Sequence, residues 1–304
     1  MRKRLTVALA ALSAVALTVT GSAQPQSRLH FLSRHVWHEN FEGFGGLSGF
    51  ELAENGQDFL AITDRMMLIE GKLLRSGSAD ALAGVEITRH APLEIPRDLH
   101  RKAWLRDSEG LAQLPDGTLY VSLEHIHQVW RYPHAFGAPL ALPQHADFRG
   151  FPRNAGMEAL AVDRHGQIYA VPESVPRKRP NLPLYRLGAG GWQILYYIEA
   201  SDDFDPVGAD FGPDGLFYLL ERRFTGIGFR SRLRRFDLNR FDPAGEVLLS
   251  TGTRVHDNLE GLSIWRDANG VIRATMLADD NFKFFQTSEI VEYALPSSRK
   301  GQTP

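Results

Sequence analysis

The chain has 304 residues, 43% of them hydrophobic, and a formal net charge of −2. This length suits one large domain or two ordinary ones, and the weakly acidic balance argues against nucleic acid or an anionic membrane as a partner. The chain contains no cysteine, which excludes disulfide bonds and thiol chemistry.

The first 23 residues predict a signal peptide. Three basic residues at positions 2–4 precede an apolar run from Leu5 to about Val19, and Gly21-Ser22-Ala23 supplies the small residues that signal peptidase requires. The apolar run is short for a membrane span, although a retained anchor is the alternative. We therefore expect general secretory export to the periplasm or beyond. The mature chain, 24–304, is expected to form one domain that is monomeric and does not bind membranes.

A strand is expected within "RLHFLSRHVWHE" at 28–39, and a hairpin pattern then recurs five times. In each copy a short apolar strand is followed by an Asp-Gly, His-Gly or Asn-Gly turn and a second strand. The equivalent positions Gly110, Ala159, Gly208 and Gly261 give a period close to fifty residues. The copies are "GGLSGFELAENGQDFLAITDR" at 45–65, "DSEGLAQLPDGTLYVSLE" at 107–124, "GMEALAVDRHGQIYAVPE" at 156–173, "VGADFGPDGLFYLLERR" at 207–223 and "NLEGLSIWRDANGVIRATMLADDN" at 258–281.

This period predicts the fold. A third strand follows each hairpin and there is room for a fourth, and three to four antiparallel strands every fifty residues are typical of a β-propeller blade. The predicted fold is all-β, a β-propeller of five or six four-stranded blades. The N-terminal strand is expected to complete the last blade, which closes the ring and covers two sheet edges. The long stretch between Gly46 and Gly110 has room for a degenerate sixth copy. A β-sandwich is the competing fold, but it requires no such period.

Acidic residues stand at both ends of these hairpins. In a propeller the first strand of each blade lines the central channel, and the second strand runs antiparallel to it. The start of the first strand and the end of the second therefore meet at one mouth of the channel. The predicted metal ligands at that mouth are Asp64, Glu109, Glu124, Glu158, Glu173, Glu221, Glu260 and Asp280, with Asp107 and Asp257 close by.

Clustered carboxylates repel one another and require compensation. A hard divalent cation is one remedy, and an oxygen-rich site without cysteine favours Ca²⁺, with Mg²⁺ as the other possibility. Basic residues at the same end are the second remedy. A single strand-start acid can also simply accept backbone N–H bonds from the next blade. The basic residues that follow these acids are Arg65, His125, His127, Arg222, Arg223 and Lys283, and a further basic run lies at 177–179.

The phrases "GGLSGFEL", "DSEGLAQLPDGTLYVSLE", "GMEALAVDRHGQIYAVPE" and "DNLEGLSI" resemble the phytase-like family, exported bacterial proteins named for "esterase-like activity of phytase". The resemblance extends from about Leu29 to Leu295. It implies a β-propeller and suggests a calcium-dependent phosphoester hydrolase, in which channel-mouth carboxylates hold calcium and basic residues bind the phosphate. Of the family's functional residues, only the acids can be assigned to individual positions of this sequence. The acidic motifs of the phytases themselves have no clear match in it.

These features predict a hydrolase that acts on a small anionic or ester substrate. Glu109 or Glu158 would accept a proton from water, while Arg65 and either Arg222 or Arg223 would neutralise charge on the phosphoryl oxygens. No Gly-x-Ser-x-Gly motif supports a serine nucleophile. The alternatives are a gluconolactonase-type lactonase or esterase, and a non-catalytic propeller that binds a ligand or a protein.

Overall fold

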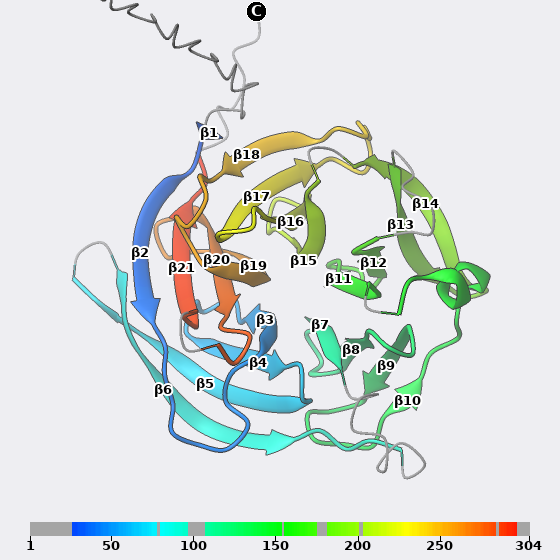
Figure 1. Cartoon of the computed structure of the whole chain (residues 1–304), viewed down its shortest axis with the longest axis horizontal. Helices are drawn as coiled ribbons and strands as arrows, with labels where there is room; N and C mark the ends of the chain where they lie inside the picture. The colour runs from blue at the N-terminus through cyan, green and yellow to red at the C-terminus, as the bar shows by residue number, and fades with distance from the viewer. Residues whose placement is uncertain are drawn as a thin grey trace, which may run out of the picture.

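The computed structural model describes residues 26–77, 80–96, 107–153, 155–174, 181–200, 203–283 and 286–296. The expected signal peptide and the basic run at 177–179 lie outside these residues. Five antiparallel sheets surround a central axis (Figure 1). Their innermost strands contact one another in ring order, and the last of them contacts the first. The prediction of an all-β propeller is therefore confirmed, and the described residues form five blades.

Blades 1 to 3 follow the chain from the inside of the ring to the outside, each with four strands. Blade 1 contains β3 (Leu47–Leu52), β4 (Asp58–Thr63), β5 (Met67–Ser76) and β6 (Ala81–Pro92). Blade 2 contains β7 (Ser108–Gln113), β8 (Leu119–Leu123), β9 (Gln128–Tyr132) and β10 (Leu140–Ala141). After a short 3-10 helix, η3 (Ala146–Gly150), blade 3 contains β11 (Met157–Val162), β12 (Ile168–Pro172), β13 (Asn181–Gly188) and β14 (Gly191–Glu199).

The N-terminal segment joins blades 4 and 5. Blade 4 contains β15 (Asp205–Phe211), β16 (Phe217–Phe224), β17 (Phe229–Phe236) and β18 (Glu246–Ser250), and the two-residue strand β1 (Gln26–Ser27) pairs with its outer edge. Blade 5 contains β19 (Asn258–Arg266), β20 (Ile272–Asp279), β21 (Glu289–Ala294) and, as its outer strand, β2 (His30–Val36). The N-terminal strand thus closes the ring as predicted.

The long stretch between the first two copies forms no sixth blade in the residues described. It lengthens the outer hairpin of blade 1, where β5 has 10 residues and β6 has 12. Five hydrophobic clusters fill the spaces between neighbouring blades. Between blades 4 and 5, for example, Leu220 and Leu233 pack with Leu259 and Met276, all of them buried.

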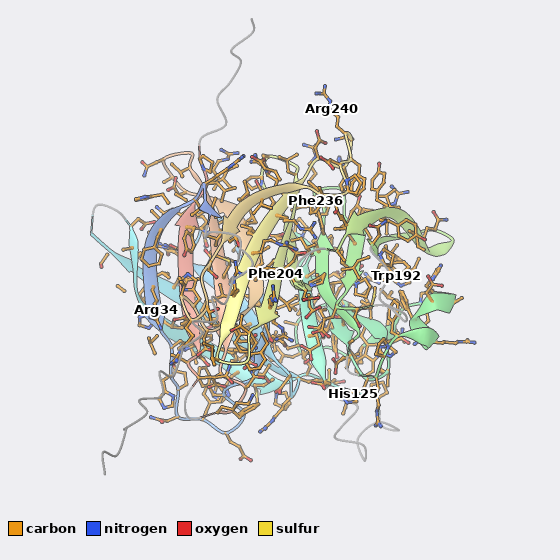
Figure 2. All side chains as sticks on the ribbon, turned by 45° about the horizontal axis from the view of Figure 1, so that its top comes forward. Arg34, His125, Trp192, Phe204, Phe236 and Arg240 are labelled. Carbon is orange, nitrogen blue, oxygen red and sulfur yellow. The ribbon has the colours of Figure 1, made fainter. Side chains whose placement is uncertain are left out.

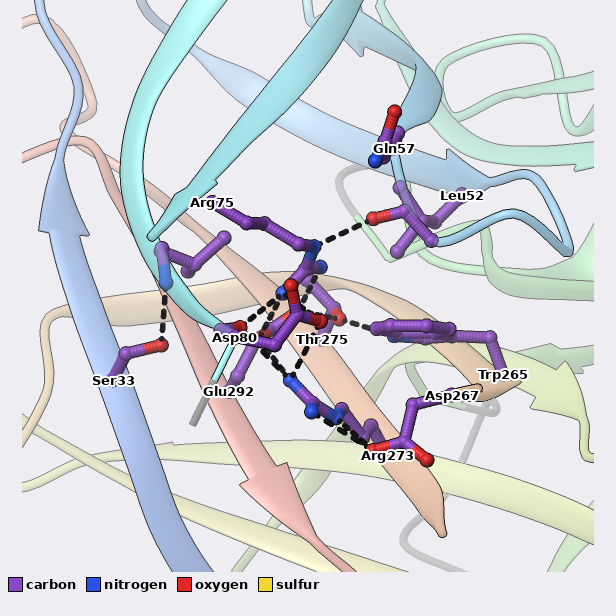
Figure 3. Close-up of polar contacts among 12 residues, drawn as sticks. Ser33, Leu52, Gln57, Arg75, Asp80, Trp265, Asp267, Arg273, Thr275 and Glu292 are labelled. Atoms are coloured by element: carbon purple, nitrogen blue, oxygen red, sulfur yellow. Dashed lines mark hydrogen bonds and ion pairs between the residues drawn. The ribbon is translucent and has the colours of Figure 1, made fainter. Parts of the chain in front are cut away.

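A buried ion-pair network joins the first blade to the last (Figure 3). Arg75 of β5 donates two hydrogen bonds, of 2.8 and 2.6 Å, to the carboxylate of Glu292 on β21. Thr275 donates to the same carboxylate at 2.9 Å, and Arg273 lies 3.5 Å from it while pairing with Asp267 at 2.8 Å. The side chains of Arg75 and Glu292 are 5% and 0% exposed, so this contact is part of the core at the ring closure.

The repeated Glu-Gly-Leu sequence has a structural cause. Every inner strand begins with a β-bulge, and in blades 2, 3 and 5 the bulge contains Glu109, Glu158 and Glu260. The next residue is glycine or alanine because the neighbouring inner strand approaches closely. A Cβ on Gly110 would lie 2.5 Å from the carbonyl oxygen of Glu158, and one on Gly208 would lie 2.3 Å from that of Glu260. A bulge re-aims a side chain, here at the mouth of the channel.

Candidate functional site

The candidate site lies at the mouth where the inner strands begin. Figure 2 shows His125 at this end of the propeller, with Phe236 and Arg240 at the opposite end. The register agrees, because Phe236 pairs with Phe217 at the start of β16, while Glu124 and His125 follow the end of β8. Acidic residues from all five blades therefore lie around one mouth, although the acid of blade 4 is Asp205 and not the predicted Glu221.

Within the described part of the chain, two groups of side chains offer closely spaced ligand atoms. Carboxylate oxygens of Glu109, Glu124 and Glu158 lie within 4.8 Å of one another, and so do single ligand atoms of Asp107, Glu124 and His125. Glu124 belongs to both groups. His125 Nδ1 lies 2.9 Å from Asp107 Oδ2 and 3.3 Å from Glu124 Oε2. Since only 8% of Glu124 and 4% of Glu158 are exposed, water compensates these charges poorly.

The pKa values of these acids reflect the crowding. Burial, and then the charges of Asp107 and Glu173, raise the pKa of Glu124 from 4.5 to about 8. Burial also raises the pKa values of Glu109 and Glu158 well above their usual range, and neighbouring carboxylates add to both shifts. Burial raises the pKa of Asp107, although His125 opposes this shift. A pKa of about 8 keeps Glu124 largely protonated near neutral pH unless a cation replaces the proton.

This donor set fits a hard divalent cation. Both groups are dominated by carboxylate oxygens, the ligands that Ca²⁺ and Mg²⁺ prefer, and His125 adds a single nitrogen. The spacing of the oxygens supports a bound cation. The bulges hold Glu109 and Glu158 beside Glu124 even though their charges repel, and a cation would offset this repulsion. The identity of the cation is part of the proposal below.

Arg222 compensates the other half of the mouth. Its guanidinium contacts Glu260 directly, donates to Asn258 Oδ1 at 3.0 Å and reaches Glu173 Oε1 at 3.3 Å. Asn258 in turn donates to Glu260 at 2.7 Å. Glu260 and Glu173, predicted as metal ligands, are thus paired with a protein cation and belong to neither group of ligand atoms found among the described residues.

A further acidic corner joins blades 1 and 5. Burial, followed by the charges of Asp279 and Asp107, raises the pKa of Asp64 from 3.8 to about 7. Burial raises the pKa of Asp279 to about 6. Asp280, the predicted ligand, instead accepts hydrogen bonds from the backbone N–H groups of Phe282 at 2.9 Å and Gly46 at 3.3 Å. Asp279 also accepts a backbone hydrogen bond, from Asn281 at 2.7 Å, and of the two acids it acts more strongly on the pKa of Asp64.

The prediction that Glu221 is a metal ligand is not supported. Glu221 is fully buried and accepts hydrogen bonds from Arg232 Nε at 2.6 Å and Arg234 Nε at 2.9 Å. Side chains alternate along a strand, so Glu221 and Arg222 point to opposite faces of β16. Arg223 shares the face of Glu221 and lies 3.8 Å from Asp203, so it does not join the carboxylates around Arg222.

Two other residues complete the mouth. Arg65 is 62% exposed, lies 3.9 Å from Asp64 and stacks over the ring of Phe282 at 3.7 Å. Asp205, which the sequence analysis missed, pairs with Arg222 across β15 and β16, and burial raises its pKa to about 6. It occupies the place in its copy that Asp107 has in the second copy, 98 positions earlier.

A protein-family model matches most of the chain. The model for the phytase-like family, "Esterase-like activity of phytase", matches residues 42–282. The chain belongs to the phytase-like family. No curated protein matches the chain. In the described part of this phytase-like protein, no helix is long and apolar enough to span a membrane.

Several solved structures are similar to the chain at low identity. A protein proposed to be a gluconolactonase is 11% identical over 90% of this chain and 95% of its own, with a TM-score of 0.46. A streptogramin B lyase is 11% identical over 87% and 88%, with a TM-score of 0.43. A PQQ-bound aldose sugar dehydrogenase from Streptomyces coelicolor is 12% identical over 89% and 99%, with a TM-score of 0.42. Likenesses at this level leave the chemistry of the site open.

Proposed function

We propose that this phytase-like protein is a phosphoester hydrolase that requires a divalent cation, with Ca²⁺ as the favoured ion. The observation that carries the proposal is the pair of ligand groups that share Glu124, in a family described by the esterase-like activity of phytase. Phosphate esters suit a site where fixed carboxylates hold a cation and an arginine lies beside them. We further propose that the protein acts as an exported monomer on a small anionic substrate.

The cation would be held by Asp107, Glu124 and one of Glu109 and Glu158, with His125 beside them, which leaves the other glutamate free as a base. Bound there, a divalent cation neutralises phosphoryl oxygens and lowers the pKa of a coordinated water. Its charge would also favour the ionised form of the four carboxyls, which burial opposes.

The protein's own residues then have distinct roles. Glu109 or Glu158 accepts a proton from the attacking water, whose oxygen forms a bond to phosphorus. The phosphorus–oxygen bond to the alcohol breaks, and the carboxyl returns the proton to the leaving alkoxide. Arg222 is fixed by Glu260 and Asn258 at the edge of the carboxylates and stabilises charge on the phosphoryl oxygens. Arg65 is exposed and can approach the same oxygens from the rim.

One panel tests the proposal. The mature protein is treated with chelator, reloaded with Ca²⁺ or Mg²⁺, and assayed on an aryl phosphate, an aryl ester and a lactone. We expect Ca²⁺-dependent turnover of the phosphate only, and a loss of at least about a hundredfold in kcat for Glu109→Gln and Glu158→Gln. A matched control is Glu246→Gln, an acid that is 38% exposed and pairs with Arg235 on the outer strands of blade 4.

The other outcomes reassign the function. Turnover of the lactone or the carboxylic ester in place of the phosphate would identify a lactonase or esterase. A Ca²⁺-dependent rise in melting temperature without turnover of any substrate would identify a binding module. If Ca²⁺ changes neither the melting temperature nor the activity, the metal site is refuted.

A further inference from the structure

A hairpin beside the carboxylates carries strongly exposed apolar side chains. Ile227 is 74% exposed and Phe224 is 62% exposed, the highest values for large apolar residues in the described chain. The hairpin joins β16 to β17, and its turn is fixed because Thr225 donates from both N and Oγ1 to the carbonyl of Gly228, at 2.9 and 2.8 Å. Packing within the fold does not explain why these two apolar side chains are exposed to solvent.

The hairpin follows directly on the part of β16 that carries Arg222. Phe224 is two residues beyond Arg222 on β16, so the two side chains share a face of the strand. At a rise of about 3.3 Å per residue, Phe224 lies about 7 Å further along β16 than Arg222. The ring of Phe229, its partner on β17, packs against it with centroids 5.2 Å apart.

A second segment enlarges this apolar surface. The backbone N–H of Arg254 donates to the carbonyl of Phe229 at 2.9 Å, which places the loop before β19 beside the hairpin. The next residue, Val255, is 51% exposed. We call Phe224, Ile227 and Val255 the rim patch. Single exposed apolar residues are ordinary on protein surfaces, but a group of them beside a polar site marks a ligand contact.

The charges at the mouth restrict what can lie there. Arg222 is already engaged by Glu260 and Glu173, and Arg223 lies near Asp203. Among the described residues, Arg65 is then the exposed arginine left at the mouth, so a ligand with many phosphates would place most of its charge against carboxylates. One phosphate beside the cation site, attached to an apolar group, matches both the acids and the rim patch.

We infer that the site takes a phosphate monoester whose alcohol is an apolar aryl or alkyl group, and that this group rests on Phe224 and Ile227. The catalytic half of this inference rests on the proposed function, whereas the ligand preference can be measured without turnover.

Binding of stable phosphonates tests the preference directly. Calorimetry on the Ca²⁺-loaded protein compares phenylphosphonate with methylphosphonate, for the wild type and for the double variant Phe224→Ser/Ile227→Ser. We expect phenylphosphonate to bind about tenfold more tightly to the wild type, because its ring buries apolar surface. The double variant should lose this difference while its affinity for methylphosphonate stays the same. The control is Leu140→Ser, since Leu140 on β10 is 54% exposed and lies on the outer strand of blade 2.

Kinetics separate this inference from the proposed function. With 4-nitrophenyl phosphate the double variant should raise KM about tenfold and leave kcat unchanged, whereas KM for glycerol phosphate should not move. Hydrolysis of both substrates with no phenyl preference would overturn the inference and leave the hydrolase. A phenyl preference without hydrolysis would support the ligand class and refute the catalytic proposal. If phenylphosphonate does not bind, or if the double variant keeps the preference, the inference is overturned.

Discussion

The guanidinium of Arg222 on blade 4 contacts the carboxylate of Glu260 on blade 5, across the boundary between the two blades. By direct ion pairs the ring of acids falls into two parts, although the charge of Arg222 also lowers the pKa values of Glu109, Glu124 and Glu158. Around Arg222 the carboxylates of Glu260 and Glu173 are neutralised by the protein itself. Around Glu124 no arginine or lysine of the described chain forms an ion pair with the clustered carboxylates. The second part is therefore where a cation would bind.

Removing Arg222 should destabilise the protein and increase its dependence on cations. In Arg222→Gln the carboxylates of Glu260 and Glu173 lose their charged partner at a largely buried site. We expect a loss of about 2 kcal/mol in the free energy of unfolding at pH 7.5, measured with urea in the presence of chelator. Millimolar Ca²⁺ should restore part of this loss.

The neighbouring arginine provides the control for this experiment. Arg223 is 37% exposed and its partner Asp203 is 76% exposed, so Arg223→Gln should change stability by less than about 0.5 kcal/mol. Adding Glu260→Gln to Arg222→Gln should recover stability, because the uncompensated charge is removed. Equal effects of Arg222→Gln and Arg223→Gln would contradict the division of the acids into two parts.

The sequence predicted the blades and the common mouth because both follow from one rule. An antiparallel hairpin fixes which ends meet, so a fifty-residue period is enough to bring Glu109, Glu124 and Glu158 together. The period did not predict the direction in which the side chain of Glu221 points. That residue lies one position before the aligned acids, and in a strand a shift of one position turns the side chain to the other face, where Arg232 and Arg234 bind it.

Asp205 could not be found from strand ends alone, although Asp107 was expected near the mouth. Asp107, Asp205 and Asn258 occupy one equivalent position, three residues before the repeated glycine, and all three face the mouth. The other two copies have glycine there, so the position does not stand out as a pattern. The sequence also could not distinguish Asp279 from Asp280, because both accept backbone N–H bonds from the turn that follows them, at 2.7 Å from Asn281 and 2.9 Å from Phe282. Asn281 in that turn has a φ of 48°.

Glu124 should be the most important single residue for cation affinity, since it belongs to both groups of ligand atoms. We expect Glu124→Gln to weaken Ca²⁺ binding at least about tenfold at pH 7.5, measured by calorimetry, because it removes a charged oxygen that both groups share. Glu260→Gln should have a smaller effect, since Glu260 is bound by Arg222 and Asn258. If the two variants lose equal affinity, the cation does not lie at the shared carboxylate.

Glu221→Gln should affect stability rather than cation binding. The substitution removes the charge of Glu221 from beside Arg232 and Arg234, whose side chains are 5% and 2% exposed. We expect a loss of about 3 kcal/mol in the free energy of unfolding, the scale at which a buried ion pair is broken. The Ca²⁺ affinity of the folded variant should match that of the wild type. A large fall in Ca²⁺ affinity with little change in the free energy of unfolding would indicate that Glu221 is a metal ligand.

Without a cation, the protein should be more stable at pH 5 than at pH 8. The pKa of Asp64 rises from 3.8 to about 7 on folding, and that of Glu124 rises from 4.5 to about 8. Between these values the folded protein binds more protons than the unfolded chain, so the free energy of unfolding falls as the pH rises. The contribution is fully present below about pH 4 and is lost as the pH passes 7 to 8. The melting temperature with chelator should therefore decline from pH 5 to pH 8.5.

Calcium should flatten this pH profile. A bound cation replaces the protons on the crowded carboxyls, so the melting temperature at pH 8 should rise with added Ca²⁺ while the value at pH 5 changes little. Glu124→Gln serves as the internal control, because an amide does not titrate and the chelator profile of this variant should be flatter than that of the wild type. A wild-type melting temperature that increases from pH 5 to pH 8.5 in chelator would show that these carboxyls are not held at raised pKa values by their burial.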